Sequence, residues 1–208
     1  MTDERINLIF DCDGTLVDSY PAILDAVGRV LKRHGIDRDP AELRDRALHS
    51  SVIGCLTDIV PAYGLDPDAV YQEFRAEKQD LGLIPLYPHA RELLQDPRFR
   101  CFVYTHRGVS ARIIFSGLGV DSCLEEIVDS TYGFQRKPDP QGVDYLVEKY
   151  ALDKKRTYYV GDRVLDLECG RNAGVGTIFF DSSGLDLDTS GADHIVSDLG
   201  DIAGLPFK

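Results

Sequence analysis

The chain has 208 residues, of which 43% are hydrophobic, and its formal net charge is −12 at pH 7. This size is sufficient for a buried core and a small second domain. The acidic balance argues against binding to the phosphate backbone of DNA or RNA, which requires a basic face. The five cysteines lack the C-x-x-C spacing, which argues against a disulfide framework or a zinc site and for reduced thiols.

The beginning of the chain and its longest apolar runs bear on localisation. The first five residues are polar and lead directly into an apolar run, with no signal peptide before it. No apolar run approaches the ~18 residues of a membrane span. We therefore expect a cytoplasmic protein that binds neither membranes nor nucleic acid. No coiled-coil heptads occur, so a monomer is the default expectation.

The first predicted strand is followed by a block of helices. Ile6–Phe10 is a short apolar run typical of a buried strand. Apolar residues at three- and four-residue intervals then predict a helix with Ser19 as N-cap, Pro21 in its first turn and Gly35 at its end. Further helices are expected at 41–48, 52–63 and 68–81. Residues 16–83 are thus predicted to form a small all-helical domain.

Beyond Pro85 and Pro88 the pattern changes to alternating strands and helices. Strands are expected at 100–104, 127–129, 157–160, 177–180 and 194–196, and helices at 110–118, 141–150 and 163–173. This alternation predicts an α/β fold with a doubly wound parallel sheet, formed by residues 1–15 and 84–208. In such folds ligands bind at the carboxyl edge of the sheet.

The segment Asp11-Cys12-Asp13-Gly14-Thr15 directly follows the first predicted strand. Strands disfavour aspartate, and two carboxylates held close together repel each other. A divalent cation and a phosphate-bearing substrate would relieve that repulsion, and one carboxylate would then be free to attack phosphorus. This segment is therefore the first candidate for the active site.

Three further polar features follow predicted strands. They are Thr105 after 100–104, Lys137 in Arg136-Lys137-Pro138-Asp139-Pro140, and Gly161-Asp162-Arg163-Val164-Leu165-Asp166 after 157–160. In order and type, the four features together resemble the motifs of the haloacid dehalogenase-like (HAD) phosphohydrolase superfamily. The resemblance extends from Ile6 to about Val196. It implies a Rossmann-like core with a helical cap domain inserted after the first strand.

The resemblance assigns the chemistry to two aspartates. Asp11 would be the nucleophile that forms an aspartyl-phosphate. Asp13 would be the general acid for the leaving group and then the base that activates water. The Asp11 side chain, the Asp13 backbone carbonyl and Asp162 would bind Mg²⁺, with Asp166 behind these ligands.

The resemblance also implies which residues bind the phosphoryl group. Thr105 would hold a phosphoryl oxygen and Lys137 would neutralise the charge of the transition state. Gly14 would allow the backbone to approach the phosphate closely. His106, next to Thr105, is a further candidate for substrate or phosphate binding.

The resulting hypothesis is a Mg²⁺-dependent phosphomonoester hydrolase that acts on a small phosphorylated metabolite through an aspartyl-phosphate. Tyr104-Thr105-His106-Arg107 and Gly133-Phe134-Gln135-Arg136-Lys137-Pro138 resemble the phosphoglycolate phosphatase-like subgroup. Two alternatives remain: a sugar-phosphate mutase of the β-phosphoglucomutase type, and a phosphate-binding module without catalytic activity. The presence of both Asp11 and Asp13 argues against the second.

Overall fold

The computed structural model describes residues 4–77, 79–184 and 187–207. The chain divides into two compact units. The larger one comprises the residues up to Asp18 together with those from Ile84 onward, and the smaller one comprises Ser19–Leu83. The chain thus passes from the larger unit into the smaller one after Asp18, three residues later than the predicted boundary between residues 15 and 16. Among the described residues, no helix has the length and apolar character needed to cross a bilayer.

The larger unit contains a six-stranded sheet in the order β3-β2-β1-β4-β5-β6, with every neighbouring pair parallel. Its strands are β1 (Ile6–Phe10), β2 (Phe99–Tyr104), β3 (Leu124–Val128), β4 (Thr157–Gly161), β5 (Gly176–Phe180) and β6 (His194–Val196). The predicted doubly wound parallel fold is therefore confirmed. The chain runs outward from β1 to β3 and then, from β4, outward in the opposite direction, so the order reverses between β1 and β4. Ligands of such sheets bind at the carboxyl ends beside this reversal.

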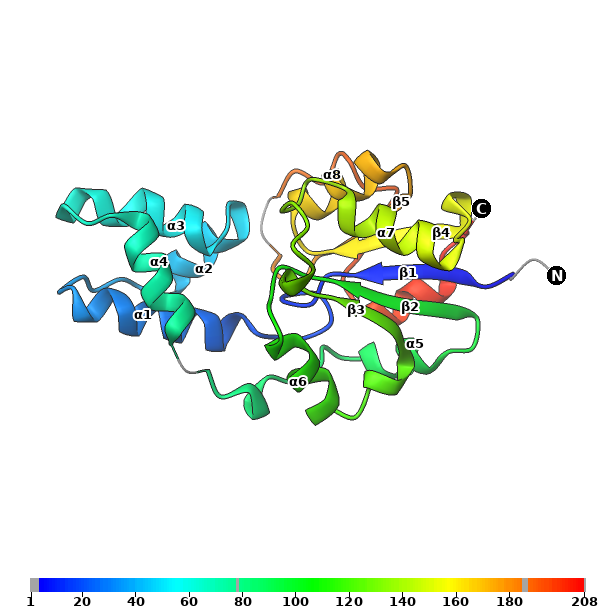
Figure 1. The fold of residues 1–208 in the computed structure, drawn as a ribbon, viewed down its shortest axis with the longest axis horizontal. Helices are drawn as coiled ribbons and strands as arrows, with labels where there is room; N and C mark the ends of the chain where they lie inside the picture. Colours follow the sequence, from blue (N-terminus) through cyan, green and yellow to red (C-terminus); the bar gives the residue numbers. More distant parts are fainter. Residues whose placement is uncertain (1–3, 78, 185–186, 208) are drawn as a thin grey trace. The chain divides into compact units, whose positions relative to one another are not determined.

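Helices cover both faces of this sheet. They are α5 (Ala90–Gln95), α6 (Ser110–Gly117), α7 (Gln141–Tyr150) and α8 (Val164–Ala173), with the 3₁₀ helices η3 (Asp121–Cys123), η4 (Ser130–Tyr132), η5 (Lys154–Arg156) and η6 (Leu199–Gly204). Figure 1 shows α7 and α8 on one side of the sheet and α5 and α6 on the other. This double cover explains why every residue of β1 is buried. It also explains why the central strands β1 and β4 are buried along their whole length without alternation.

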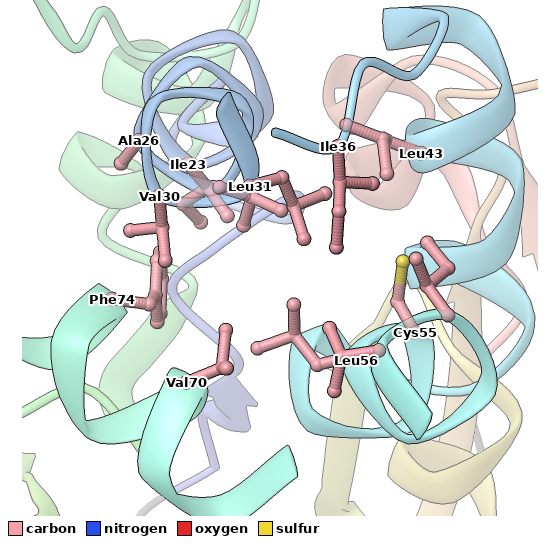
Figure 2. Close-up of a cluster of buried hydrophobic side chains, with 13 residues drawn as sticks. Ile23, Ala26, Val30, Leu31, Ile36, Leu43, Cys55, Leu56, Val70 and Phe74 are labelled. Atoms are coloured by element: carbon pink, nitrogen blue, oxygen red, sulfur yellow. The ribbon is translucent and has the colours of Figure 1, made fainter. Parts of the chain in front are cut away.

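The smaller unit is entirely helical in the part that the structure describes. Its helices are α1 (Tyr20–Arg33), α2 (Pro40–His49), α3 (Val52–Ile59) and α4 (Pro67–Ala76), with the 3₁₀ helices η1 (Val60–Tyr63) and η2 (Leu81–Leu83). Buried apolar residues of α1 to α4 form a separate core, and Figure 2 shows Leu31, Leu56, Val70 and Phe74 among its side chains. This unit therefore has a core of its own, as an inserted domain requires.

Some predicted boundaries were wrong. The helix expected at 52–63 ends at Ile59 and continues as the 3₁₀ helix η1, because Pro61 has no N–H to donate within an α-helix. The helix expected at 68–81 ends at Ala76, since Glu77 is extended and its carboxylate accepts a hydrogen bond from Arg29 of α1 over 3.2 Å. Strand β3 begins three residues before the predicted start and ends one before the predicted end. Helix α5 was not predicted at all.

Candidate active site

The sequence-predicted residues lie at one edge of the sheet. Asp11 and Asp13 follow β1, Thr105 follows β2, and Asp162 follows β4, the strand next to β1. Lys137 precedes α7. The structure thus places these residues where the strand order reverses, although they come from four separate segments of the chain.

Lys137 lies at the centre of the group. Its Nζ donates to Asp11 Oδ1 over 2.6 Å and to Asp166 Oδ1 over 2.7 Å, and its side chain is fully buried. The ammonium also faces the rings of Tyr104 and Tyr159, 5.5 and 5.3 Å from their centroids. Burial alone would lower the pKa of Lys137, but the attraction of the two carboxylates outweighs it and the pKa is raised. The lysine is therefore held in its charged form.

Asp11 is buried, and its two oxygens differ in their surroundings. Oδ1 accepts the hydrogen bond from Lys137, whereas Oδ2 has no hydrogen-bond partner among the described residues. Arg163 Nη2 lies 4.0 Å from Oδ2, beyond hydrogen-bond distance. Burial raises the pKa of Asp11, with Lys137 acting in the opposite direction. Burial of a carboxylate oxygen without a hydrogen-bond partner costs free energy, so we expect Oδ2 to bind a ligand.

Asp11, Asp162 and Asp166 bring carboxylate oxygens within 4.8 Å of one another, and all three residues are buried. Three carboxylates beside one lysine leave an excess of negative charge away from water. Hard divalent cations such as Mg²⁺ prefer oxygen ligands of this kind. The donor set and the partnerless Oδ2 of Asp11 among the described residues therefore fit a divalent cation.

Asp166 is held by contacts within the protein. Its Oδ1 accepts from Lys137, and its Oδ2 accepts from the backbone N–H of Arg163 over 3.2 Å at the start of α8. The neighbouring Gly161 leaves room for it, because a Cβ at that position would lie 2.3 Å from the Asp166 Cβ. Asp166 thus orients Lys137 while it caps the helix.

Asp13 forms an ion pair with Arg107. The Arg107 Nε lies 2.9 and 3.0 Å from the two carboxylate oxygens, and Nη2 lies 2.6 Å from Oδ1. Gly14, the next residue, has φ of +84°, in the left-handed region that favours glycine. In the turn after β1, the Asp11 side chain thus contacts Lys137 and the Asp13 side chain contacts Arg107.

Thr105 and His106 follow β2. The Thr105 hydroxyl accepts from the backbone N–H of Arg107 over 3.1 Å. His106 Nε2 accepts from the backbone N–H of Lys137 over 2.9 Å, so a neutral ring carries its proton on Nδ1. Burial, reinforced by the positive charges of Lys137 and Arg136, lowers the pKa of His106 to about 2. His106 therefore fixes the backbone at Lys137 in this structure, and phosphate binding by it stays a prediction.

The structure adds two contacts to this group. Thr15, which was assigned no role from the sequence, donates its hydroxyl to Asp162 Oδ1 over 3.0 Å. Arg107, which follows His106 and was considered from the sequence as a contact for phosphate or substrate, pairs with Asp13. The signal for Thr15 in the sequence was its position two residues after Asp13.

A family model described as haloacid dehalogenase-like hydrolase matches residues 8–180. The chain belongs to this family. The family match and the named relatives confirm the prediction of a phosphatase from this family.

Two named relatives differ in their stated activity. A phosphoglycolate phosphatase from Rhodospirillum rubrum is 30% identical over 190 residues, which cover 82% of this chain and 77% of the relative. A pyrophosphatase PpaX from Listeria monocytogenes is 25% identical over 179 residues, covering 83% and 82%. A solved structure described as a predicted phosphoglycolate phosphatase from Haemophilus somnus has a TM-score of 0.81 at 21% identity and covers 98% of this chain and 99% of its own. At that identity the structural likeness shows the fold alone.

Proposed function

We propose that the protein is a Mg²⁺-dependent phosphomonoester hydrolase that acts on a small phosphorylated metabolite through an aspartyl-phosphate on Asp11. One observation carries this proposal. Asp11 is buried at the end of β1, with one oxygen held by Lys137 and the other, among the described residues, without a hydrogen-bond partner. Such a carboxylate is oriented and still has an oxygen available for phosphorus or a metal ion.

The metal ligands would be the Asp11 side chain, the Asp13 backbone carbonyl and Asp162. When bound, Mg²⁺ would neutralise the phosphoryl oxygens and so permit a dianionic ester to approach a carboxylate. Asp162 suits this role because Thr15 fixes its Oδ1. Asp166 remains behind these ligands, since both of its oxygens already accept hydrogen bonds from Lys137 and Arg163.

The reaction has two steps in this proposal. In the first, an Asp11 oxygen bonds to phosphorus, the bond from phosphorus to the ester oxygen breaks, and Asp13 gives that oxygen a proton. In the second, Asp13 takes a proton from water, which attacks phosphorus and displaces Asp11. Lys137 and Thr105 would hold the phosphoryl oxygens during both steps. Gly14 and His106 complete the proposed phosphate site.

The smaller unit, Ser19–Leu83, is the proposed cap domain. Its insertion between β1 and β2 and its independent hydrophobic core support this assignment. Caps of this kind exclude water and select the leaving group. The names of the relatives, phosphoglycolate phosphatase and pyrophosphatase, support a small phosphorylated substrate.

Phosphate release from a panel of small phosphomonoesters tests the proposal. Wild type, Asp11→Asn and the control Asp121→Asn, which changes an exposed aspartate of η3, are compared with Mg²⁺ and after chelation. We expect release only with Mg²⁺ and an intact Asp11, and a phosphoryl group on the Asp11 peptide after acid quenching. Normal activity of folded Asp11→Asn would refute the nucleophile. Isomerisation of a sugar phosphate without stoichiometric phosphate release would identify a mutase.

A further inference from the structure

We infer that Arg107 recognises a second anionic group on the substrate, a carboxylate or phosphate close to the ester oxygen. In the structure, the Asp13 carboxylate occupies the position that this group would take. This inference rests on the proposed function, because it names the class of ester that the same site would select.

The geometry of Arg107 is that of a carboxylate receptor. Its Nε and Nη2 make three contacts of 2.6 to 3.0 Å with the two oxygens of Asp13. A guanidinium matches a carboxylate or phosphate in this forked way, whereas an ammonium cannot. The Arg107 backbone is fixed as well, since its N–H donates to Thr105 Oγ1 and its carbonyl accepts from Ser130. The guanidinium therefore starts from a fixed backbone position.

The pair of Arg107 with Asp13 can exchange more readily than the contacts of Lys137. The Lys137 ammonium lies between Asp11 and Asp166, whose side chains are 3% and 0% exposed. The Asp13 side chain is 23% exposed, while that of Arg107 is 8% exposed. Asp13 is thus the carboxylate that can turn away from the guanidinium while the guanidinium stays in place. An incoming anion would then take over its contacts.

The position of Arg107 limits the size of the leaving group. Arg107 lies one hydrogen bond from Asp13 before the exchange, and in the proposed reaction the released Asp13 reaches the ester oxygen by a hydrogen bond. The ester oxygen and the guanidinium are then separated by roughly 5 to 7 Å. A carboxylate one carbon away from the ester oxygen, or a phosphate joined directly to it, spans this gap with one hydrogen bond. Replacement of Asp13 by the substrate anion would also free the Asp13 oxygens for the ester oxygen.

A matched pair of esters tests the inference. 2-Phosphoglycolate and 2-hydroxyethyl phosphate differ only in a carboxylate against a hydroxymethyl group, and pyrophosphate supplies the phosphate version. For each protein, the ratio of kcat/KM for the anionic substrate to that for 2-hydroxyethyl phosphate is measured. We expect Arg107→Gln to lower this ratio about 10- to 100-fold, and Arg107→Lys to restore only part of it. The control Arg171→Gln removes an exposed charge from α8 and should keep the wild-type ratio.

Binding provides a readout that does not depend on turnover. The same esters are titrated calorimetrically into the Asp11→Asn protein and into the double variant that combines Asp11→Asn with Arg107→Gln. We expect the preference for the anionic ester to disappear with the guanidinium. An unchanged preference would overturn the inference even if phosphate release is normal. A loss confined to phosphoglycolate or to pyrophosphate would identify which anion is recognised.

The same measurements separate the inference from the proposed function. Failure of wild type to hydrolyse any ester would count against the proposed function. The binding ratio of the two Asp11→Asn proteins would still decide the role of Arg107, because it requires no phosphoryl transfer.

Discussion

The hydroxyl of Thr15 donates a hydrogen bond to Asp162 Oδ1 over 3.0 Å, which joins the turn after β1 to the loop after β4. Both residues are buried, Thr15 completely. The two loops carry Asp11 and Asp162, which are proposed to share one metal ion. Because a hydrogen bond to a ligand oxygen fixes the orientation of the carboxylate, we propose that Thr15 orients Asp162 for the metal ion.

Thr15→Val therefore tests the metal site. Valine keeps the shape of threonine but removes the hydroxyl that donates to Asp162 Oδ1. We expect the Mg²⁺ concentration for half-maximal activity to rise about 10-fold, in the range found when such supporting groups are removed. Thr15→Ser retains the hydroxyl and serves as the control. A Mg²⁺ dependence of Thr15→Val equal to that of wild type would show that the contact only stabilises the fold.

A comparison of Asp166→Asn with Asp162→Asn separates positioning of the lysine from binding of the metal. Asp166 accepts from Lys137 Nζ and from the Arg163 backbone, so its loss should weaken the orientation of Lys137. We expect Asp166→Asn to lower kcat about 10- to 100-fold with little change in Mg²⁺ dependence. Asp162→Asn should instead raise the Mg²⁺ requirement. Titration of activity against Mg²⁺ measures both effects, and a large shift for Asp166→Asn would identify Asp166 as a direct ligand.

The sheet could be predicted from the sequence because its strands are buried on both faces. Apolar runs such as Ile6–Phe10 and Thr157–Val160 cannot alternate when helices cover the sheet on both sides, so they are easily recognised. Helix ends were harder to predict. The end of α4 depends on the ion pairs of Glu77 with Arg29 and Arg33, which connect residues more than 40 positions apart.

The site could be predicted in part for a similar reason. Residues at strand ends gather at one edge of a parallel sheet, which brings Asp11, Thr105 and Asp162 together whatever their rotamers. The choice of partners could not be predicted. Whether Lys137 or Arg107 pairs with Asp13 depends on side-chain conformation and burial, which leave no periodic signal in the sequence.

His106 is expected to make the stability of the protein depend on pH. Burial and nearby positive charges lower its pKa from 6.5 to about 2 in the folded protein. Below pH 6.5 the unfolded chain therefore binds a proton that the folded protein excludes. The free energy of unfolding must then fall as the pH falls, by on the order of 1 kcal/mol per pH unit at most.

His106→Gln removes the titration but keeps an acceptor for the Lys137 N–H. Urea denaturation of both proteins from neutral pH down to about pH 4.5 should show wild type losing stability relative to the variant, with the gap opening below the unfolded pKa of 6.5. His106→Phe loses titration and acceptor together, so it should share the flat profile of His106→Gln but have a lower kcat, because the Lys137 backbone is no longer fixed. Parallel curves for wild type and His106→Gln would mean that the imidazole protonates in the folded protein as readily as in the unfolded chain.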